Sequence, residues 1–267
     1  MTKKNKETAY YKDLEYSTSA ELCEKMAAEC DTAILAFSCG KDSIASWLQM
    51  RRYFRRIVPY YCYVVPGLQF VEDSLKYYED FFGCHIYRLP HRSFPRYMRQ
   101  KVFQPPSHVK AIAAGDIPAR DEYTDEIIGD IIRYSGKLPD AAFTGVGVRA
   151  ADSPYRRIAI GRHGAINYNR KQFFPVYDWV KDDIIRAIDE AGIKLPVDYR
   201  LFGRTFDGLD YRFTKEIRDH FPEDYERLLE WYPFAELDIM RYEGFDTVRG
   251  RTREQVEGIA GTGKGQE

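Results

Sequence analysis

Ala33-Ile34-Leu35-Ala36-Phe37-Ser38-Cys39-Gly40-Lys41-Asp42-Ser43 is the stretch that decides the fold of this chain. An apolar run ends at Phe37, Ser38 and Gly40 permit a tight turn, and residues 44–50 continue with helical spacing. This pattern predicts that the backbone N–H groups of residues 39–43 point outward at the N-terminus of a helix. Such groups, together with the positive end of the helix dipole, attract anions. The sequence therefore predicts a phosphate site at this loop.

The side chains of the loop strengthen this prediction. Lys41 adds a point charge, and the hydroxyls of Ser38 and Ser43 can donate further hydrogen bonds to phosphate. Asp42 repels phosphate unless it orients Lys41 or holds a bridging cation, so we expect Asp42 to bind Mg²⁺. The loop is not a Walker A motif, which has Ser or Thr directly after the Lys. The alternative is an ordinary strand-to-helix turn, in which Ser38 caps the helix and Gly40 makes the turn.

Strands and helices alternate along the chain around this loop. Helices are predicted at 18–30, 42–55 and 71–82, and strands at 32–38, 57–65, 85–89 and 141–146. We expect an α/β fold, with a doubly wound, mainly parallel sheet covered by helices on both faces and followed by a helical C-terminal lobe. Ligands of such sheets bind beyond the carboxyl ends of the strands. The segments expected at that edge are 38–43, Pro66-Gly67, Leu89-Pro90 and 145–149.

Shifts in composition divide the chain into four expected parts. They are a helical N-terminal extension over 1–30, a nucleotide-binding α/β domain over 31–200, an aromatic-rich helical lobe over 201–257 and a disordered tail over 258–267. With 267 residues, of which 44% are hydrophobic and 30% charged, the chain can bury a large core. It has no apolar run of roughly 18 residues and no charged-then-apolar leader, so we expect a cytoplasmic protein without a membrane segment.

A basic and aromatic segment interrupts the alternation at about 91–120. The formal net charge of −1 gives the whole chain no basic signature, so nucleic-acid binding would depend on a local patch of this kind. Cations here could grip a phosphate backbone while aromatic rings stack on bases. The alternative is a solvated helix followed by a surface loop. The cations expected to contact nucleic acid are Arg92, Arg96, Arg99 and Lys101.

A second set of anion-binding side chains follows the strand predicted at 141–146. Arg149 and Arg156 are seven positions apart, so they share a face if the segment is helical. Guanidinium groups suit phosphate or sulfate better than the Lys ammonium does, because they can donate in pairs. A salt-bridged helix is the alternative. The residues expected to bind the substrate anion are Arg149, Ser153, Arg156 and Arg157.

These segments together resemble a known superfamily. Ser38-Cys39-Gly40-Lys41-Asp42-Ser43 is similar to the SxGKDS loop of the PP-loop ATP pyrophosphatases, also called adenine nucleotide alpha hydrolases. Segments 64–72, 145–156 and 174–184 resemble, in order, the next motifs of the phosphoadenosine phosphosulfate reductase-like branch, so the resemblance spans roughly 30–212. Three positions depart from it: Val65 and Pro66 stand where the branch has Asp and Thr, and Asp152 stands where it has Glu.

The resemblance implies a nucleotide site and assigns roles within it. It implies ATP and Mg²⁺ as cofactors, and it places pyrophosphate on the loop. The corresponding arginines of the branch face the active site, which favours the same role for Arg149 and Arg156. The implied catalytic residues are Lys41, Asp42, Arg149 and Arg156, and the implied nucleotide-binding residues are Ser38, Cys39, Gly40, Lys41, Asp42, Ser43, Pro66, Gly67 and Gly145.

The cysteines limit which activity of this branch is expected. All five lie at or before Cys84, without C-x-x-C spacing, so we expect no zinc site and no iron–sulfur cluster in this chain. Assimilatory reductases of the branch use a C-terminal nucleophilic cysteine, and this sequence has no cysteine after Cys84. Without that thiolate no thiosulfonate forms, so sulfate reduction of the usual kind is disfavoured. We interpret Cys39 as a small residue that fills the loop.

The sequence thus predicts an ATP pyrophosphatase that adenylylates an acceptor oxygen and releases pyrophosphate. We expect the acceptor on a nucleic acid, DNA or tRNA, where a protein partner supplies sulfur or nitrogen for insertion, as in the DNA phosphorothioation enzymes of the same branch. Two alternatives stay open. One is a reductase of adenylyl sulfate or phosphoadenylyl sulfate that borrows a partner's cysteine; the other is a non-catalytic nucleotide-binding subunit of a DNA-acting complex with a nuclease partner. We also expect a homo-oligomer.

Overall fold

A six-stranded sheet organises the computed structural model, which describes residues 15–110 and 123–244. Its strands are β1 (Thr32–Ala36), β2 (Arg56–Tyr63), β3 (Tyr87–Pro90), β4 (Thr144–Val146), β5 (Ile166–Asn167) and β6 (Gln172–Phe173). They lie in the order β3-β2-β1-β4-β6-β5. Among the described strands, only the pairing of β5 with β6 is antiparallel. The expected mainly parallel sheet is confirmed.

Strand β1 lies between two parallel neighbours, and its sequence suits that place. Residues 32–35 are buried, and Ile34 pairs with Val58 of β2 on one side and with Thr144 of β4 on the other. A strand covered on both faces has a continuous apolar run instead of an alternating one. Leu35 packs into the core on one face of the sheet and Ile34 into the core on the other. The strand therefore requires helices on both sides.

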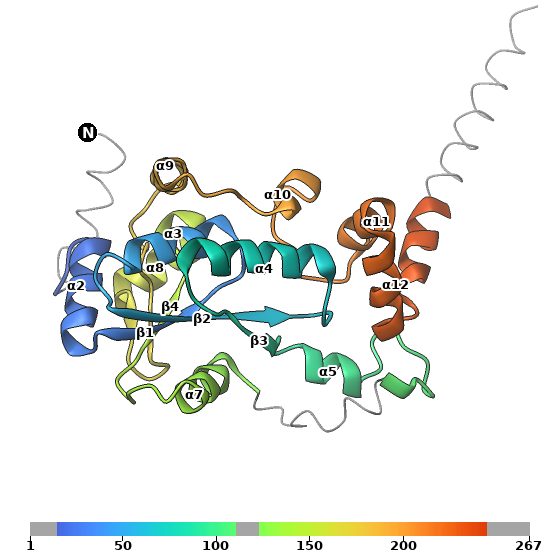
Figure 1. Cartoon of the computed structure of the whole chain (residues 1–267), viewed down its shortest axis with the longest axis horizontal. Helices are drawn as coiled ribbons and strands as arrows, with labels where there is room; N and C mark the ends of the chain where they lie inside the picture. The colour runs from blue at the N-terminus through green and yellow to red at the C-terminus, as the bar shows by residue number, and fades with distance from the viewer. Residues whose placement is uncertain (1–14, 111–122, 245–267) are drawn as a thin grey trace, which may run out of the picture.

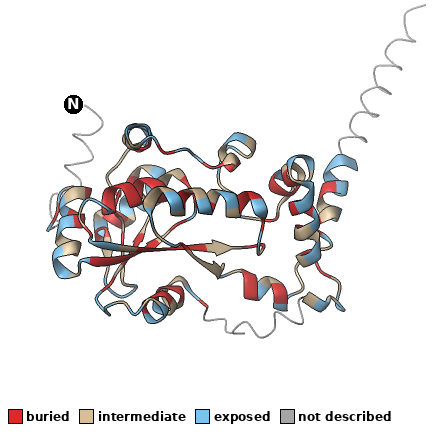
Figure 2. Ribbon diagram, viewed as in Figure 1, coloured by how far each residue is buried: buried red, intermediate tan, exposed pale blue. Residues whose placement is uncertain are grey.

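Helices do cover both faces (Figure 1). On one side lie α3 (Lys41–Met50), α4 (Gln69–Phe82), α8 (Pro154–His163) and α9 (Lys181–Ala191), with α2 (Ser19–Glu29) at the end of the sheet. On the other side α7 (Asp125–Ser135) packs Ile128 and Ile132 against Ile34. Figure 2 shows that burial is concentrated on the strands and on the helix faces turned toward them. The doubly wound α/β fold is confirmed.

The C-terminal lobe is helical, as expected, and packs at the carboxyl edge of the sheet. It comprises α10 (Val197–Leu201), α11 (Tyr211–His220), α12 (Pro222–Trp231) and helical residues 235–244. Figure 1 places α11 and α12 beyond the ends of β2 and β3, near α5 (Phe94–Arg99). The Phe221 ring stacks on Phe70 of α4 with centroids 4.8 Å apart, and the Tyr232 hydroxyl donates to the Val64 carbonyl (2.9 Å). Aromatic side chains therefore join the lobe to the sheet domain.

Some element ends differ from the expected ones. The helix expected over 42–55 ends at Met50, and the N–H groups of Arg52 and Tyr53 then bond carbonyls only three residues back, those of Gln49 and Met50. The strand expected over 57–65 ends at Tyr63, where the chain turns toward α4. The hairpin of β5 and β6 was not predicted, because strands of two residues are too short to carry a pattern.

Part of the predicted organisation lies outside the described residues. This holds for residues 1–14 of the expected extension, for 111–122 of the basic excursion and for the expected tail over 258–267. The domain boundaries therefore stay predictions. In the ranges 15–110 and 123–244, the structure has no helix that is long and apolar enough to cross a bilayer.

Candidate functional site

The loop between β1 and α3 is held together by its own serine hydroxyls. Ser43 Oγ donates to the Gly40 carbonyl (2.8 Å) and accepts from the Ser38 N–H (3.2 Å). Gly40 is the N-cap of α3, with φ −77° and ψ 152° and no side-chain cap hydrogen bond. The two serines therefore stabilise the loop by hydrogen bonds to its own backbone. Ser38 does not cap the helix, as the alternative interpretation would require.

The expectation that all N–H groups of residues 39–43 point outward is wrong for two of them. The Gly40 N–H donates to Ser38 Oγ (3.3 Å), and the Lys41 N–H donates to the Tyr199 hydroxyl (2.9 Å). Tyr199 lies on α10, far away in the sequence. A hydroxyl that can bind anywhere along the chain leaves no pattern near the loop, so this contact could not be foreseen. The N-terminus of α3 is thus partly satisfied by the chain itself.

Cys39 turns its side chain into the core. Its φ of 58° lies in the left-handed region, which is strained for a residue with a Cβ atom, and only 3% of the residue is exposed. Burial raises the pKa of its thiol well above the ordinary value, so the thiol is unreactive at neutral pH. This supports the interpretation of Cys39 as a loop-filling residue, which contributes to a nucleotide site through its backbone only.

Alternating ion pairs connect this loop to the segment that follows β4. Lys41 Nζ lies 2.6 Å from Asp42 Oδ2, and Arg149 Nε lies 2.9 Å from Asp42 Oδ1. Arg149 Nη2 lies 2.7 Å from Asp152 Oδ1, and Arg156 Nη1 lies 2.6 Å from Asp152 Oδ2. We call these five residues the ion-pair chain. It contains the four predicted catalytic residues, so the structure brings together two motifs that are far apart in the sequence.

Burial decreases from the middle of the ion-pair chain toward its ends. The side chain of Arg149 is 8% exposed, against 28% for Lys41 and 47% for Arg156. Although Arg149 Nε and Asp42 Oδ1 are close, neither atom has a hydrogen-bond partner among the described residues. Their alignment therefore leaves hydrogen-bonding capacity inside a buried site. An anion that enters from solvent meets a cation at either end.

Gly147 lets the segment after β4 approach the loop. A Cβ atom at Gly147 would lie 2.9 Å from the Asp42 carbonyl carbon and 3.0 Å from Ser43 N, which is closer than such atoms come in proteins. Gly145 has a packing role instead, since a Cβ atom there would lie 2.6 Å from Met50 Sδ. Of these two glycines, Gly147, which was not assigned to the site, touches the loop, whereas the predicted Gly145 touches the core.

The segment from Arg149 to Arg156 is not one helix, so the condition for a shared helical face of the two arginines is not met. Arg149 is extended, residues 150–152 form a 3₁₀ turn (Ala150–Asp152), and α8 begins only at Pro154. Ser153, expected to bind the substrate anion, caps α8 by accepting the Arg156 N–H (3.1 Å). The two arginines meet instead on the carboxylate of Asp152. Arg157, one position further along α8, is exposed.

Pro66 and Gly67 lie in a part of the edge that contacts α12. Arg227 of α12 donates to the Gly67 carbonyl. The carboxylate of Asp224, 3% exposed, accepts the Gln69 N–H (2.6 Å) and the Phe70 N–H (3.0 Å) at the start of α4. The C-terminal lobe therefore satisfies this helix terminus. A role of Pro66 and Gly67 in nucleotide binding stays a prediction.

The predicted nucleic-acid contacts lie on and beside α5. Arg92 pairs with Asp125 of α7 (3.4 Å), and the Arg96 guanidinium lies 5.7 Å from the centre of the Tyr97 ring. Arg96 and Arg99 are exposed, whereas Lys101 is partly buried and has a φ of 52°. The cations therefore do not form one continuous set, and nucleic-acid binding stays a prediction.

Whether Asp42 can bind Mg²⁺ depends on what its carboxylate already contacts. Each Asp42 oxygen already contacts a cation, Lys41 on one side and Arg149 on the other. Across the part of the chain that the structure describes, no group of three or more His, Cys, Asp or Glu side chains could hold a metal ion. To bind a metal ion, the Asp42 carboxylate would have to exchange one of these two contacts for it. Binding of Mg²⁺ at Asp42 stays a prediction.

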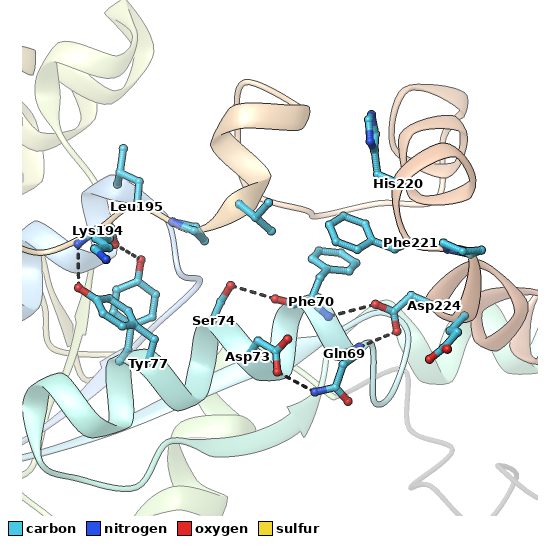
Figure 3. A pocket seen from close by; sticks show the side chains of 15 residues that line it. Gln69, Phe70, Asp73, Ser74, Tyr77, Lys194, Leu195, His220, Phe221 and Asp224 are labelled. Carbon is cyan, nitrogen blue, oxygen red and sulfur yellow. Dashed lines mark hydrogen bonds between the residues drawn. The ribbon is translucent and has the colours of Figure 1, made fainter.

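A separate hollow lies on the outer side of α4. It measures about 610 Å³ and is lined by α4, by residues 194–197 and by the junction of α11 and α12. Figure 3 shows Phe70, Tyr77, Leu195 and Phe221 around it, with Asp73 and His220 at its rim. None of its lining residues belongs to the predicted site. The hollow is therefore distinct from the ion-pair chain.

Comparisons with known proteins add little to this geometry. No protein-family model and no curated protein matches the sequence. Among solved structures, the NH3-dependent NAD synthetase from Campylobacter jejuni subsp. jejuni NCTC 11168, in complex with the nitrate ion, is similar with a TM-score of 0.40 and 11% identity. The match covers 90% of this chain and 95% of that one. A TM-score this low supports no conclusion about activity, so function has to be argued from the site itself.

Proposed function

We propose that this chain is an ATP pyrophosphatase that uses the loop 38–43 and the ion-pair chain to transfer AMP to an acceptor oxygen. The observation that supports this most is the ion-pair chain, because it joins the SxGKDS-like loop to the arginine motif in one site. A chance resemblance of two separate short segments would not require their side chains to meet. The geometry therefore supports the same site as the sequence resemblance.

The proposed reaction uses the cations of the site to stabilise negative charge. The acceptor oxygen bonds to the α-phosphorus, the bond from that phosphorus to the bridging oxygen breaks, and the electron pair leaves with pyrophosphate. The proton of the acceptor hydroxyl passes to solvent. Negative charge builds on the leaving pyrophosphate, and in this proposal the Lys41 ammonium and the loop N–H groups that are not bonded within the chain stabilise it. Arg156, half exposed, is available to bind the other end of the substrate.

For the acceptor we propose a nucleic acid, with sulfur or nitrogen supplied by a protein partner. Arg96 and Arg99 are exposed on α5, and Tyr97 lies between them in the sequence, a composition suited to phosphate and base contacts. Burial raises the thiol pKa of Cys23, Cys39, Cys62 and Cys84. Cys30 lies at the C-terminal end of α2, before β1, whereas the phosphate loop follows β1, so we propose that the sulfur comes from the partner. The sulfonucleotide reductase alternative would likewise need a partner's thiol.

Two observations favour the binding-only alternative. Asp42 and Asp152 are both balanced by cations of the chain, and the α4 edge, which carries the departures Val65 and Pro66, is packed against α12. A site whose carboxylates are already balanced by its own cations could sense a nucleotide without turning it over. This interpretation predicts ATP binding without release of pyrophosphate.

Release of pyrophosphate from ATP and Mg²⁺, with and without DNA or tRNA, tests the proposal. We expect release by the native chain and at least about a 100-fold loss in Lys41→Ala, because a charge at the developing anion is removed. Lys76→Ala, an exposed lysine of α4, is the matched control and should behave like the native chain. Stimulation by one nucleic acid would identify the acceptor class. ATP binding without any pyrophosphate would favour the binding-only subunit, and a preference for adenylyl sulfate would favour the reductase.

A further inference from the structure

Tyr199 reaches the N-terminus of α3 from a distant part of the chain. Its hydroxyl oxygen accepts the Lys41 N–H at 2.9 Å. Thr205, in the loop after α10, lies 3.6 Å from the position that a Cβ atom at Gly40 would take. The segment 198–206 therefore packs directly on the phosphate loop and belongs to the proposed site.

Asp198 fixes the segment that carries Tyr199. Its Oδ2 accepts the Phe206 N–H (2.9 Å), and its backbone carbonyl accepts the Phe202 N–H (2.7 Å). The residue is only 5% exposed. Because Asp198 ties both halves of the segment together, Tyr199 is held next to Lys41 before any ligand binds. Such preorganisation is what a residue that positions a substrate requires.

The hydroxyl of Tyr199 keeps a hydrogen that it can donate. A phenol accepts through its oxygen and donates one O–H, and the contact with Lys41 uses only an acceptor position. Burial raises the pKa of Tyr199 above its ordinary value of 10.0, so the hydroxyl is protonated at neutral pH. The side chain is only partly buried, so a ligand at the start of α3 can reach it.

We propose that Tyr199 is a positioning residue for pyrophosphate: it keeps its hydrogen bond to the Lys41 N–H and donates its O–H to an oxygen of the β- or γ-phosphate. The inference rests on the proposed function and deepens it, because it adds a donor that lies outside the loop motif. A neutral donor suits a leaving group, since its hydrogen bond strengthens as negative charge builds up on pyrophosphate.

Tyr199→Phe tests this role, since it removes the hydroxyl and keeps the ring. Calorimetric titration with ATP, inorganic pyrophosphate and AMP should show about tenfold weaker binding of ATP and pyrophosphate, as expected for one hydrogen bond to a charged group. AMP binding should not change, because AMP does not carry the leaving phosphates. The thermal midpoint of the free protein should fall slightly, because the Lys41 N–H loses the acceptor that the Tyr199 hydroxyl provides. Tyr134→Phe, at a tyrosine of α7 that is 87% exposed, is the matched control.

Several outcomes would overturn the inference. Unchanged affinity for pyrophosphate would show that the hydroxyl does not contact it, and tighter binding would show that the hydroxyl blocks the site. An equal loss for AMP would indicate a structural role. If Lys41→Ala loses ATP while Tyr199→Phe keeps it, the proposed function stands and the inference fails. If the native chain binds neither ATP nor pyrophosphate, both fail.

Discussion

The N-termini of α3 and α4 lie at the same edge of the sheet, and the chain treats them in opposite ways. At α4 the buried carboxylate of Asp224 accepts two backbone N–H groups, so a negative charge of the chain already occupies the positive end of the helix. At α3 the Lys41 N–H meets the neutral Tyr199 hydroxyl, and cations surround the start of the helix. The dipole of each helix favours an anion at its N-terminus.

This comparison teaches that a helix terminus alone does not specify the phosphate site. The C-terminal lobe supplies a carboxylate to one terminus and a hydroxyl to the other, and only the second leaves room for a negatively charged ligand. The lobe therefore takes part in choosing where the edge of the sheet binds an anion. Four substitutions would break or sharpen the comparison.

Arg149→Ala should have the largest effect, because Arg149 contacts both carboxylates of the ion-pair chain at the α3 terminus. We expect a loss of about 3 kcal/mol in the free energy of unfolding, as for other buried ion pairs that lose one partner. Pyrophosphate release should fall by at least about 100-fold. Urea unfolding and the release assay measure the two losses. The exposed Arg162 of α8 provides the control, and an Arg149→Ala protein no worse than Arg162→Ala would contradict a central role.

Asp224→Asn should be next and should affect stability alone. The amide keeps the shape of the side chain but loses its charge and turns one donor toward the backbone N–H groups of Gln69 and Phe70. We expect a loss of about 2 kcal/mol in the free energy of unfolding. Glu223→Gln, at the exposed residue just before Asp224 in the first turn of α12, is the control. Weaker ATP binding in Asp224→Asn would show that the two termini are not independent.

Gly147→Ala should have a smaller effect, focused on the α3 terminus. The new methyl group would press on the backbone of Asp42 and Ser43 and move the loop away from the ion-pair chain. We expect a loss of about 1 kcal/mol in the free energy of unfolding and weaker ATP binding. Gly244→Ala is the control, because nothing lies within 4 Å of a Cβ atom there. Equal ATP affinity in the two variants would argue against the need for close approach.

Asp198→Asn should have the smallest effect, visible as a change in pH dependence. Burial raises the pKa of the Asp198 carboxyl above its ordinary value of 3.8. The folded state therefore holds this proton more tightly than the unfolded chain, so the contribution of Asp198 to stability falls as the pH rises from about 4 through the raised pKa. Asp198→Asn lacks this titration. Urea unfolding of both proteins across that range should show the native chain losing stability relative to the variant as the pH rises.

The sequence predicted the α3 terminus well and the α4 terminus poorly, for a physical reason. The loop 38–43 is contiguous, so its turn residues and its helix start appear together in the sequence. The cap of α4 is Asp224, which comes from another helix far along the chain. No local pattern reports a contact of that kind. Tyr199, at the α3 terminus, was missed for the same reason.

The arginine motif shows a different kind of error. Its arginines lie next to the loop as expected. The backbone between them, however, bends at residues 150–153 and does not form one helix. The pair Ser153-Pro154 marks the start of a new helix, since Ser is a preferred cap and Pro a preferred first residue. That signal was present in the sequence, and the seven-residue spacing of Arg149 and Arg156 obscured it. Spacing rules apply only after the helix start is fixed.

The buried thiol of Cys39 provides a way to measure how fast the phosphate loop opens. Its thiol cannot meet a reagent in solution while the loop is closed, because only 3% of the residue is exposed. The rate of its alkylation therefore reports how often the loop opens. A nucleotide that binds only the closed loop would slow this rate in proportion to its occupancy. The native Cys39 thiol thus allows loop opening to be followed by alkylation, and no cysteine has to be introduced.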